Sequence, residues 1–308
     1  MNQLYRGRFA PSPTGPLHFG SLVAAVGSYC QAKSQGGEWL VRMEDLDPPR
    51  ESPGAADEIL RTLEAYYLHW DGTVLFQSQR IDAYEHALNQ LSSDGHTYPC
   101  SCTRKSIATN TTTTTNSNQD KNQANSAHNI YPGTCRNGLA PGATARSTRV
   151  RVTSETVSFL DGLQGARNIQ LDSDVGDFVV KRADGLFAYH FAVVVDDAFQ
   201  EISEIVRGTD LLDSTPHHLY LQKLLSYTTP QYVHLPIAVN AQGEKLSKQT
   251  HAPAVNTTQP GVMLEKALTF LGLKPDPDVI NADPETLLKW AVKNWDLERV
   301  PKQLTISS

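Results

Sequence analysis

The sequence predicts an α/β protein: a Rossmann-like domain with a parallel sheet, interrupted by a β-rich insertion and followed by a small helical region. Three observations support this prediction. Strand-like and helix-like apolar segments alternate over residues 1–95 and again over residues 189–250, as in parallel α/β folds. Residues 96–188 consist mainly of short alternating segments typical of antiparallel strands. Residues 251–308 have the apolar spacing of amphipathic helices.

The first half of the Rossmann-like domain begins with a strand and a helix. Residues 4–10 are predicted to form the strand, which leads into a turn rich in proline and glycine. The apolar spacing of residues 17–32 predicts a buried helix. A second strand is expected at residues 38–43, and an amphipathic helix at residues 55–67. Two parallel strands joined by a helix therefore open the chain.

The insertion is expected to contain strands and one flexible segment. Alternation predicts a strand at residues 147–153 and a hairpin at residues 178–189, around the turn at Asp184 and Gly185. Residues 103–129 are rich in threonine, asparagine and glutamine and have almost no large apolar side chain. Such a segment cannot bury enough surface to order itself, so we expect it to be flexible and to carry no chemistry.

The second half of the Rossmann-like domain continues the alternation. Helix-like residues 189–198 precede a strand at residues 201–206, and a helix is predicted at residues 214–226 with Ser214 as its cap. A further strand at residues 233–239 completes this half.

Composition and charge exclude several classes of protein. The chain has 308 residues, of which 39% are hydrophobic and 19% charged, so it is long enough for about two folded domains and unlike a disordered tail. Its net charge is -6, and any contact with nucleic acid must come from local basic patches. Residues 191–195 are the longest strongly apolar run, too short to span a membrane. We expect a cytoplasmic chain without a membrane segment.

The turn after the first strand is a candidate phosphate-binding site. Gly15 and Gly20 allow a ligand to approach the backbone, and the helix that follows directs free N–H groups at it. His18 is expected at the entrance of this helix, where it can donate a hydrogen bond to a phosphate. The turn is neither a Walker A loop nor a GxGxxG fingerprint. Taken alone, such a turn is more often structural.

A second candidate site is the segment Lys245-Leu246-Ser247-Lys248, which follows a strand. Two lysines three residues apart can close over a polyphosphate and neutralise its charge. Lysines in a surface turn are usually only solvated. The two segments together, in this order and at this separation, are a far more specific indication of a nucleotide-binding site than either segment alone.

Together these segments resemble the signatures of class I aminoacyl-tRNA synthetases of the glutamyl type. His18-Phe-Gly20-Ser21 stands at the position of the HIGH signature and Lys245-Leu-Ser-Lys248 at that of KMSKS. Ser21 replaces the second histidine of HIGH, and Leu246 replaces the methionine of KMSKS. The resemblance implies a class I synthetase catalytic domain at residues 1–95 and 189–250 that binds ATP with Mg²⁺. It implies these ATP-binding residues: His18, Gly20, Ser21, Lys245, Leu246, Ser247 and Lys248, of which His18, Lys245 and Lys248 are catalytic.

The resemblance also implies a pocket for L-glutamate. A site for this amino acid needs cationic groups for the side-chain carboxylate and an acid for the ammonium. Arg8 and Arg207 are expected to bind the carboxylate, Glu44 the ammonium, and Tyr189 to supply a hydroxyl and a rigid wall. The cradle is completed by residues of the first turn: Phe9, Ala10, Pro11 and Ser12.

Three cysteines of the insertion suggest a metal site. Cys100, Cys102 and Cys135 cluster, whereas Cys30 stands alone and suits the core. Three thiolates and a fourth protein ligand form a closed, structural Zn²⁺ site that can stabilise a subdomain lacking its own core. The fourth ligand is open from residue chemistry: His128 is the more ordinary candidate, whereas Tyr131 matches the glutamyl-type pattern Cys-x-Cys followed by Tyr-x-x-x-Cys.

Basic residues of the insertion are a weaker candidate for RNA contact. Arg149 and Arg151 alternate on a predicted strand and so share a face that can meet a phosphate backbone, although a solvated face is the commoner explanation. The same loose basic set includes Arg146, Lys181 and Arg182.

The short chain implies which acceptor the enzyme uses. Full glutamyl-tRNA synthetases continue beyond the KMSKS-like loop with a large anticodon-binding portion, whereas this chain ends about sixty residues later. The chain resembles the shortened members of this family, which implies that it activates glutamate without tRNA and attaches the glutamyl group to queuosine in the anticodon of tRNA(Asp). Three alternatives remain: a short enzyme charging the tRNA 3′ end, a non-catalytic RNA-binding protein, and a nucleotidyltransferase of small metabolites. We expect a monomer.

Overall fold

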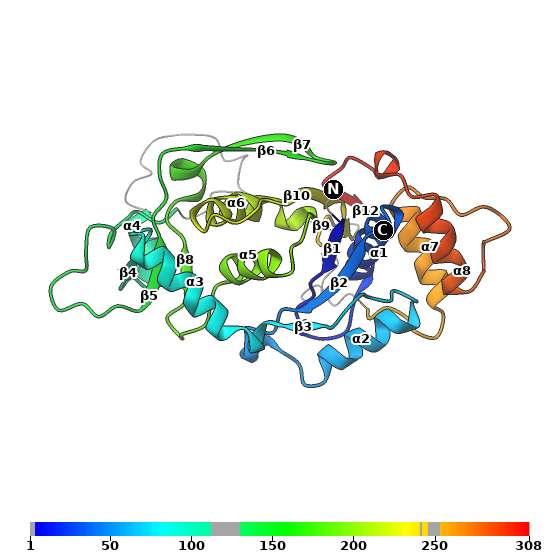
Figure 1. Ribbon diagram of the computed structural model, residues 1–308, viewed down its shortest axis with the longest axis horizontal. Helices are drawn as coiled ribbons and strands as arrows, with labels where there is room; N and C mark the ends of the chain where they lie inside the picture. Colours follow the sequence, from blue (N-terminus) through cyan, green and yellow to red (C-terminus); the bar gives the residue numbers. More distant parts are fainter. Residues whose placement is uncertain (1–3, 112–129, 241, 246–252, 308) are drawn as a thin grey trace.

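The computed structural model describes residues 4–111, 130–240, 242–245 and 253–307. Its centre is a set of parallel strands, of which β1 (Arg6–Phe9), β2 (Glu38–Met43) and β3 (Leu75–Phe76) pair in that order. β9 (Glu204–Gly208) pairs in parallel with β10 (Gln231–Leu235). The Ser203 N–H donates to the carbonyl of Arg6 at 2.9 Å and so joins the start of β9 to β1. The predicted parallel α/β fold is confirmed (Figure 1).

Helix α1 (Phe19–Ser34) is the central helix of this part of the fold. His18 caps its start, because the imidazole Nδ1 accepts a hydrogen bond from the Ser21 N–H at 3.3 Å. Leu22 and Val26 of α1 lie in the same buried cluster as Trp39 of β2. Burial of these apolar side chains holds α1 to the sheet.

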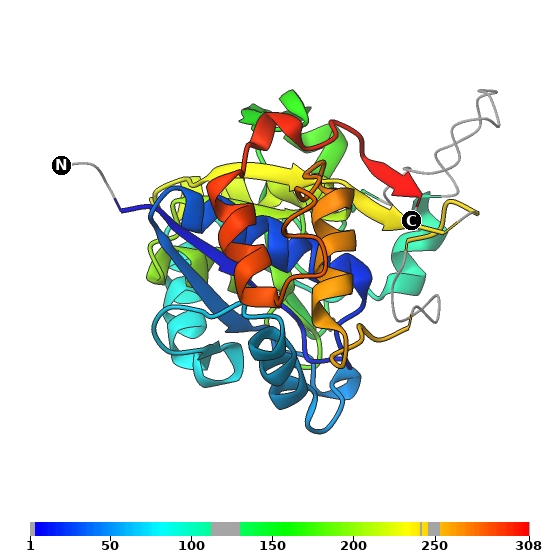
Figure 2. The same ribbon diagram turned by 90° about the vertical axis from the view of Figure 1, so that its right-hand side faces the viewer.

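The carboxyl-terminal region covers α1. Helices α7 (Pro260–Phe270) and α8 (Pro284–Lys293) pack against α1 and supply Leu264 and Leu288 to its apolar cluster (Figure 2). This helical region was predicted, but it ends in a strand. β12 (Thr305–Ser307) pairs in parallel with β11 (Ile237–Val239), so the chain returns to the strand that follows β10.

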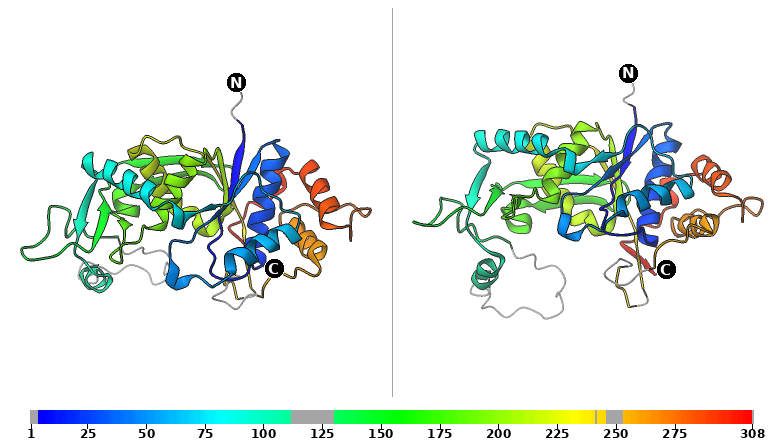
Figure 3. Two further views of the ribbon diagram at one scale, coloured as in Figure 1. Left: turned by 60° about the horizontal axis from the view of Figure 1, so that its bottom comes forward. Right: turned by 90° about the horizontal axis from the view of Figure 1, so that it is seen from below.

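The insertion lies at the end of the molecule opposite α7 and α8 (Figures 1 and 3). Its antiparallel sheet has the order β4 (Thr97–Cys100), β5 (Ser147–Val150) and β8 (Val179–Lys181). The hairpin expected at residues 178–189 begins with β8 and closes through a single bridge from Lys181 to Phe187.

Three further helices connect the insertion to the central sheet and share a second apolar core. They are α3 (Ile81–Ser93), α5 (Tyr189–Phe199) and α6 (Thr215–Leu224), whose buried side chains include Tyr84, Phe191 and Leu221. One further helix, α2 (Ala55–Ala65), carries Ile59 and Leu63 into the first core.

The segment expected to be flexible is partly helical, which corrects that prediction. Residues Arg104–Thr111 form α4. Its first turn is fixed by Thr103, whose Oγ1 accepts from the Ser106 N–H at 3.1 Å, and Ile107 packs on the cluster that contains Tyr98. The contact with a pre-existing apolar cluster supplies the burial that the segment lacks by composition. Residues 112–129 lie outside the described part of the chain.

Two other details differ from expectation. The hairpin of β6 (Thr156–Asp161) and β7 (Gly165–Gln170) falls in the range assigned to the insertion, yet β6 pairs in parallel with β10 of the central sheet. Ser214 precedes α6 but its side chain makes no capping bond, because a 3₁₀ helix runs directly into α6 and already satisfies the first turn. Within the described ranges, no helix is long and apolar enough to cross a membrane.

Candidate active site

Side chains from three strands converge at one edge of the sheet. Arg8 lies near the end of β1, Glu44 directly follows β2, and Arg207 lies near the end of β9. Carboxyl ends of parallel strands meet at one edge, where ligands bind in open α/β sheets. Tyr189, at the start of α5, interacts electrostatically with all three. The pKa of its hydroxyl is raised to about 12, mainly by burial and in part by Glu44, although Arg207 and Arg8 act to lower this pKa.

Arg8 is anchored through Nε of its guanidinium group. Its side chain is 4% exposed, and its Nε donates to Oδ1 of Asp197 at 3.1 Å. The two terminal nitrogens, Nη1 and Nη2, donate to no residue in the described part of the chain. A buried guanidinium with both terminal nitrogens uncommitted is suited to bidentate binding of a carboxylate.

Asp197 also holds Arg42. Arg42 is fully buried, and its Nη1 donates to Asp197 Oδ1 and to Gln200 Oε1, each at 2.8 Å. Burial raises the pKa of Asp197, but the charges of Arg42 and Arg8 outweigh it and leave this pKa below its ordinary value. Asp197 therefore remains an anion that ties the arginines of β1 and β2 to α5.

Glu44 lies within electrostatic reach of both arginines. Its side chain is 8% exposed, and Oε1 lies 3.5 Å from Nη2 of Arg42. Burial raises the pKa of Glu44 to about 7 against the lowering effect of Arg42 and Arg8. Its backbone N–H donates to the carbonyl of Pro11 at 3.0 Å, which joins the end of β2 to the first turn. A desolvated carboxylate in this position can bind an ammonium group.

Arg207 is held much more tightly than the expectation of a free cationic fork suggested. Its Nε donates to His234 Nε2 at 3.0 Å, and Nη1 lies 3.2 Å from His218 Nδ1. Nη2 donates to the Leu211 carbonyl at 3.1 Å and to Thr215 Oγ1 at 2.9 Å. Among the residues that the structure describes, partners engage four of the five guanidinium N–H groups, and one N–H on Nη1 is left for a ligand.

The other expected pocket residues have different surroundings. Phe9 is buried and stacks on Trp39 with ring centroids 6.2 Å apart, so its side chain belongs to the core and only its backbone can line the pocket. Ala10 and Pro11 are half-buried, and Ser12 is exposed on the turn that follows.

Lys245, the described residue of the second expected nucleotide-binding segment, lies close to the first segment. Lys245 forms an ion pair with Asp210, with Nζ 2.5 Å from Oδ2. Burial and the positive charge of Lys245 lower the pKa of His18, whereas Asp210 raises it, so all three charges lie within mutual reach. Ser21 Oγ lies 3.1 Å from His18 Nε2, and Gly20 precedes it in the first turn of α1. Leu246, Ser247 and Lys248 lie outside the described residues.

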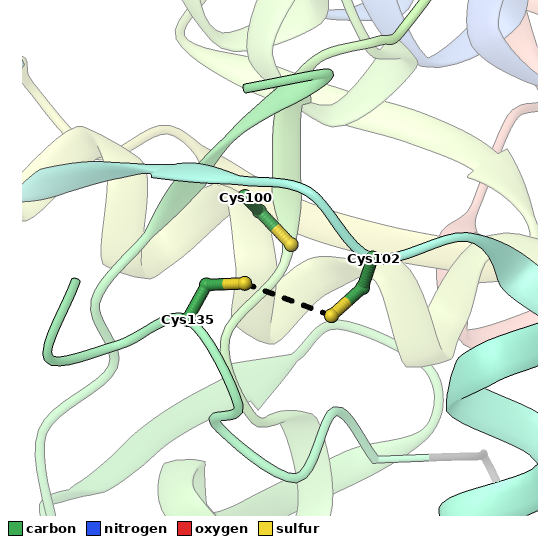
Figure 4. A group of neighbouring side chains, drawn as sticks. All are labelled: Cys100, Cys102 and Cys135. Carbon is green, nitrogen blue, oxygen red and sulfur yellow. Dashed lines mark hydrogen bonds between the residues drawn. The ribbon is translucent and has the colours of Figure 1, made fainter. Parts of the chain in front are cut away.

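The three cysteines of the insertion point their sulfur atoms at one another (Figure 4). The Sγ atoms of Cys100, Cys102 and Cys135 lie within 4.8 Å of one another, with 3.7 Å between Cys102 and Cys135. Tyr131 Oη lies 3.4 Å from Cys100 Sγ and 3.5 Å from Cys102 Sγ. Its hydroxyl therefore stands at the fourth corner of the cluster. The other candidate, His128, lies outside the described residues.

The spacing of these atoms fits a zinc ion. Zn–S bonds of about 2.3 Å and a Zn–O bond of about 2.0 Å in a tetrahedron separate two sulfurs by about 3.8 Å and a sulfur from the oxygen by about 3.5 Å. The separations given above for Cys102, Cys135 and Tyr131 match these values. Burial raises the pKa of the Cys135 thiol, but hydrogen bonds from Ser101 and Tyr131 outweigh it and lower that pKa to about 6. The donor set is that of a metal-binding thiolate cluster.

Arg149 belongs to this cluster and not to a phosphate-binding face, which corrects that expectation. It is 8% exposed, its Nε donates to Cys100 Sγ at 3.3 Å, and its guanidinium lies 3.8 Å from the centroid of the Tyr131 ring. Arg151 instead lies 4.7 Å above the ring of Tyr98. The pairing of Arg149 with thiol and carbonyl groups explains why it points inward.

Several residues that shape the pocket had no assigned role in the sequence. His234 is a single polar residue within an apolar segment, whereas Asp197 and His218 each follow an identical residue, and no local pattern indicates which member of each pair points to Arg8 or Arg207. Asp197 lies 189 positions from Arg8, so no local pattern could pair them.

Comparison with known proteins places the chain in a family. Residues 5–272 match the family described as tRNA synthetases class I (E and Q), catalytic domain. The chain is 53% identical over 306 residues to a glutamyl-Q tRNA(Asp) synthetase of Dechloromonas aromatica, covering 99% of each chain. It is 52% identical over 300 residues to one of Chromobacterium violaceum, covering 97% of this chain and 96% of that one.

A solved structure agrees with this placement at the level of the fold. The crystal structure of a glutamate tRNA ligase from Elizabethkingia meningosepticum superimposes with a TM-score of 0.78 at 22% sequence identity. The match covers 98% of this chain and 66% of that one. The chain therefore belongs to the catalytic-domain family of class I tRNA synthetases for E and Q, in the group whose members are named glutamyl-Q tRNA(Asp) synthetase.

Proposed function

We propose that this protein activates glutamate with ATP and transfers the glutamyl group to queuosine in the anticodon of tRNA(Asp), as the names of its relatives describe. One observation carries the first half of this proposal: buried groups of opposite charge, Arg8 and Glu44, lie together at the strand ends beside Arg42 and Asp197. An acidic amino acid presents the complementary charges. Lys245 and His18 provide the adjacent phosphate-binding groups.

Glutamate binding uses the charges of this pocket. The side-chain carboxylate accepts from the terminal nitrogens of Arg8 and from the remaining N–H of Arg207. The ammonium group lies against Glu44, whose ionised form it favours. Tyr189 forms the wall between them. The α-carboxylate is then left to face the nucleotide.

Activation joins this carboxylate to the nucleotide. An oxygen of the α-carboxylate attacks the α-phosphorus of ATP, the bond from that phosphorus to the bridging oxygen of the β-phosphate breaks, and pyrophosphate leaves. His18, Lys245 and Lys248 stabilise the charge that develops on the phosphates, and N–H groups of the first turn of α1 bind them. Mg²⁺ bound to ATP neutralises part of the phosphate charge. No side chain acts as a nucleophile.

Transfer releases AMP. A hydroxyl of the cyclopentenediol of queuosine attacks the carbonyl carbon of glutamyl-adenylate, an ester bond forms, and the bond to the phosphate oxygen breaks. A cavity of about 360 Å³ between the insertion and helices α5 and α6 supports this step, because His190, His217 and Phe178 provide aromatic walls and Arg149 provides a cation. We propose that the modified base enters there.

The cysteine cluster is proposed to hold one structural Zn²⁺ through Cys100, Cys102, Cys135 and Tyr131. All four positions come from the protein, so the ion would join β4 to the loop at residues 131–135 and take no part in the reaction. That the enzyme is a cytoplasmic monomer remains a prediction.

Two assays test the function. In ATP–pyrophosphate exchange without tRNA, we expect glutamate alone among the amino acids to support exchange. Mass spectrometry of tRNA after incubation with glutamate and ATP should then show a glutamyl adduct on the queuosine nucleoside of tRNA(Asp). Absence of exchange with glutamate contradicts the first step. Charging of the 3′ end of tRNA(Glu), with none on queuosine, favours a short glutamyl-tRNA synthetase instead.

A further inference from the structure

Arg207 lies in the middle of a buried chain of hydrogen bonds that the proposed reaction does not use. On one side is His234, 0% exposed, whose Nε2 lies 3.0 Å from Arg207 Nε and whose Nδ1 lies 2.5 Å from Asp161 Oδ2. On the other side His218 Nδ1 lies 3.2 Å from Arg207 Nη1, and His218 Nε2 lies 3.2 Å from His190 Nδ1. The members come from β6, β10, β9, α6 and α5.

The direction of every bond in this chain follows from Arg207. A guanidinium can only donate, so His234 Nε2 and His218 Nδ1 must both accept. The proton of His234 is then on Nδ1 and is donated to Asp161. The proton of His218 is on Nε2 and is donated to His190 Nδ1, which leaves the proton of His190 on its Nε2. Each link has one donor and one acceptor.

The Thr215 hydroxyl agrees with this assignment. Its oxygen accepts from Arg207 Nη2, and it lies 3.3 Å from His234 Nε2, toward which it can donate its proton. Arg207 requires His234 Nε2 to be an acceptor, and the Thr215 hydroxyl is compatible with that assignment.

The surroundings keep the histidines uncharged. His218 is faced by Arg207 of β9, His190 of α5, His217 of its own helix and Arg8 of β1. Burial and these groups lower its pKa well below the ordinary value. A protonated His218 would direct a second donor at Arg207 and break the link.

His190 and His234 are uncharged for related reasons. Burial, His217 and Arg207 lower the pKa of His190 to about 3. For His234, burial outweighs the opposing effect of Asp161 on its pKa. Asp161 itself stays ionised, because bonds from His234 and from the backbone N–H groups of Gln164 and Leu163 outweigh the effect of burial on its pKa.

We propose that Asp161, His234, His218 and His190 are positioning residues that hold the Arg207 guanidinium in one orientation, so that its single uncommitted N–H faces the carboxylate of glutamate. This inference rests on the proposed function of the pocket. An arginine on a flexible stem loses orientation when its anchors are removed, even when its charge remains. The pairing of β6 with β10 places Asp161 for its bond to His234, because Asp161 is in register with Tyr232 on the same strand as His234.

Substitution of His218 tests the proposal. In asparagine, Oδ1 is as many bonds from Cα as Nδ1 is in histidine, so His218→Asn keeps an acceptor for Arg207, whereas His218→Leu removes it. In ATP–pyrophosphate exchange without tRNA, we expect His218→Leu to raise KM for glutamate by about 10-fold to 100-fold, as for loss of a bond to a charged group. His218→Asn should stay within about threefold of the wild type. KM for ATP and kcat should change little in either variant.

Tyr220→Phe is the matched structural control. Tyr220 is buried on the same helix, two residues beyond His218, and donates to the Arg151 carbonyl at 2.8 Å without touching Arg207. It should lower thermal stability and leave KM for glutamate unchanged. If His218→Leu lowers only kcat or the active fraction, as a structural residue would, the inference is wrong.

A measurement on the wild-type enzyme tests the proposal even if the His218→Leu variant does not fold. Imidazole ¹⁵N chemical shifts report which nitrogen carries the proton. We expect Nε2–H tautomers for His218 and His190 and an Nδ1–H tautomer for His234. A proton on Nδ1 of His218 would overturn the inference. Failure of the proposed function would be seen separately, as absence of glutamate-dependent exchange by the wild-type enzyme.

Discussion

Asp197 anchors Arg8 in the protein interior: its Oδ1 lies 3.1 Å from Arg8 Nε, and both side chains are only 4% exposed. The same oxygen accepts from Arg42. The ion pair leaves the terminal nitrogens of Arg8 as the cationic surface of the pocket. We therefore expect the binding of an acidic amino acid at Arg8 to depend on the carboxylate of Asp197, which fixes the position of the guanidinium.

The geometry of Arg8 matters as much as its charge. Arg8→Lys keeps the charge but loses the two parallel donors, so we expect KM for glutamate to rise by about 10-fold to 100-fold in ATP–pyrophosphate exchange. Arg6→Lys is the control on the same strand, because Arg6 pairs with Glu38 and Glu201 away from the pocket. Equal effects of the two substitutions would count against a carboxylate site at Arg8.

Glu44 is expected to make the protein less stable as the pH rises. Its pKa in the folded protein is about 7, above the ordinary value of 4.5, so its contribution to stability is fully present below the ordinary value and is lost as the pH rises through about 7. Glu44→Gln removes this loss. In urea unfolding, the variant should gain at most about 3 kcal/mol relative to the wild type between about pH 5 and pH 8.

The same variant should bind glutamate more weakly. The amide introduced by Glu44→Gln has no charge for the ammonium group, so KM for glutamate should rise by about 10-fold or more while stability at about pH 8 increases. A stability difference that does not vary with pH would show that Glu44 does not titrate in this range.

Lys245 is expected to act on the chemical step. Lys245→Ala removes a cation that stabilises charge in the transition state, and kcat for glutamate activation should fall by about 10²-fold to 10³-fold with little change in KM for glutamate. Asp210→Asn should have a smaller effect, because it removes only the ion pair that restrains Lys245. Single-turnover formation of glutamyl-adenylate measures both. A larger loss from Asp210→Asn than from Lys245→Ala would contradict this order.

The cysteine cluster should hold one zinc ion per chain. Metal analysis of the purified protein by plasma mass spectrometry should give about one equivalent, and removal by a chelator should lower the melting temperature. Cys102→Ser should abolish binding, whereas Tyr131→Phe should weaken it, because the three thiolates remain. Retention of full zinc affinity by Tyr131→Phe would exclude Tyr131 as the fourth ligand.

The sequence anticipated those parts of the site that depend on local patterns. The apolar spacing of α1, the turn before it and the cap at His18 lie within one short stretch. The bounds predicted for β2 agree with those observed. Ser214 failed as a cap for a local reason, the 3₁₀ helix that runs into α6, whereas the helix α4 depends on contacts outside its own segment. For α4, Ile107 met an apolar cluster that composition alone does not reveal.

The sequence by itself determined the parallel α/β fold, which follows from apolar periodicity, and the group of three cysteines within one stretch of the insertion. The close approach of His18 and Lys245 was implied only by the resemblance of their segments to synthetase signatures. Only the tertiary structure decided that Arg8 is anchored by Asp197 and Arg207 by His218 and His234. These bonds depend on strand register and helix packing, and a shift of one residue in a strand turns a side chain to the other face. Hydrogen-bond partners of buried charges therefore cannot be inferred from residue spacing.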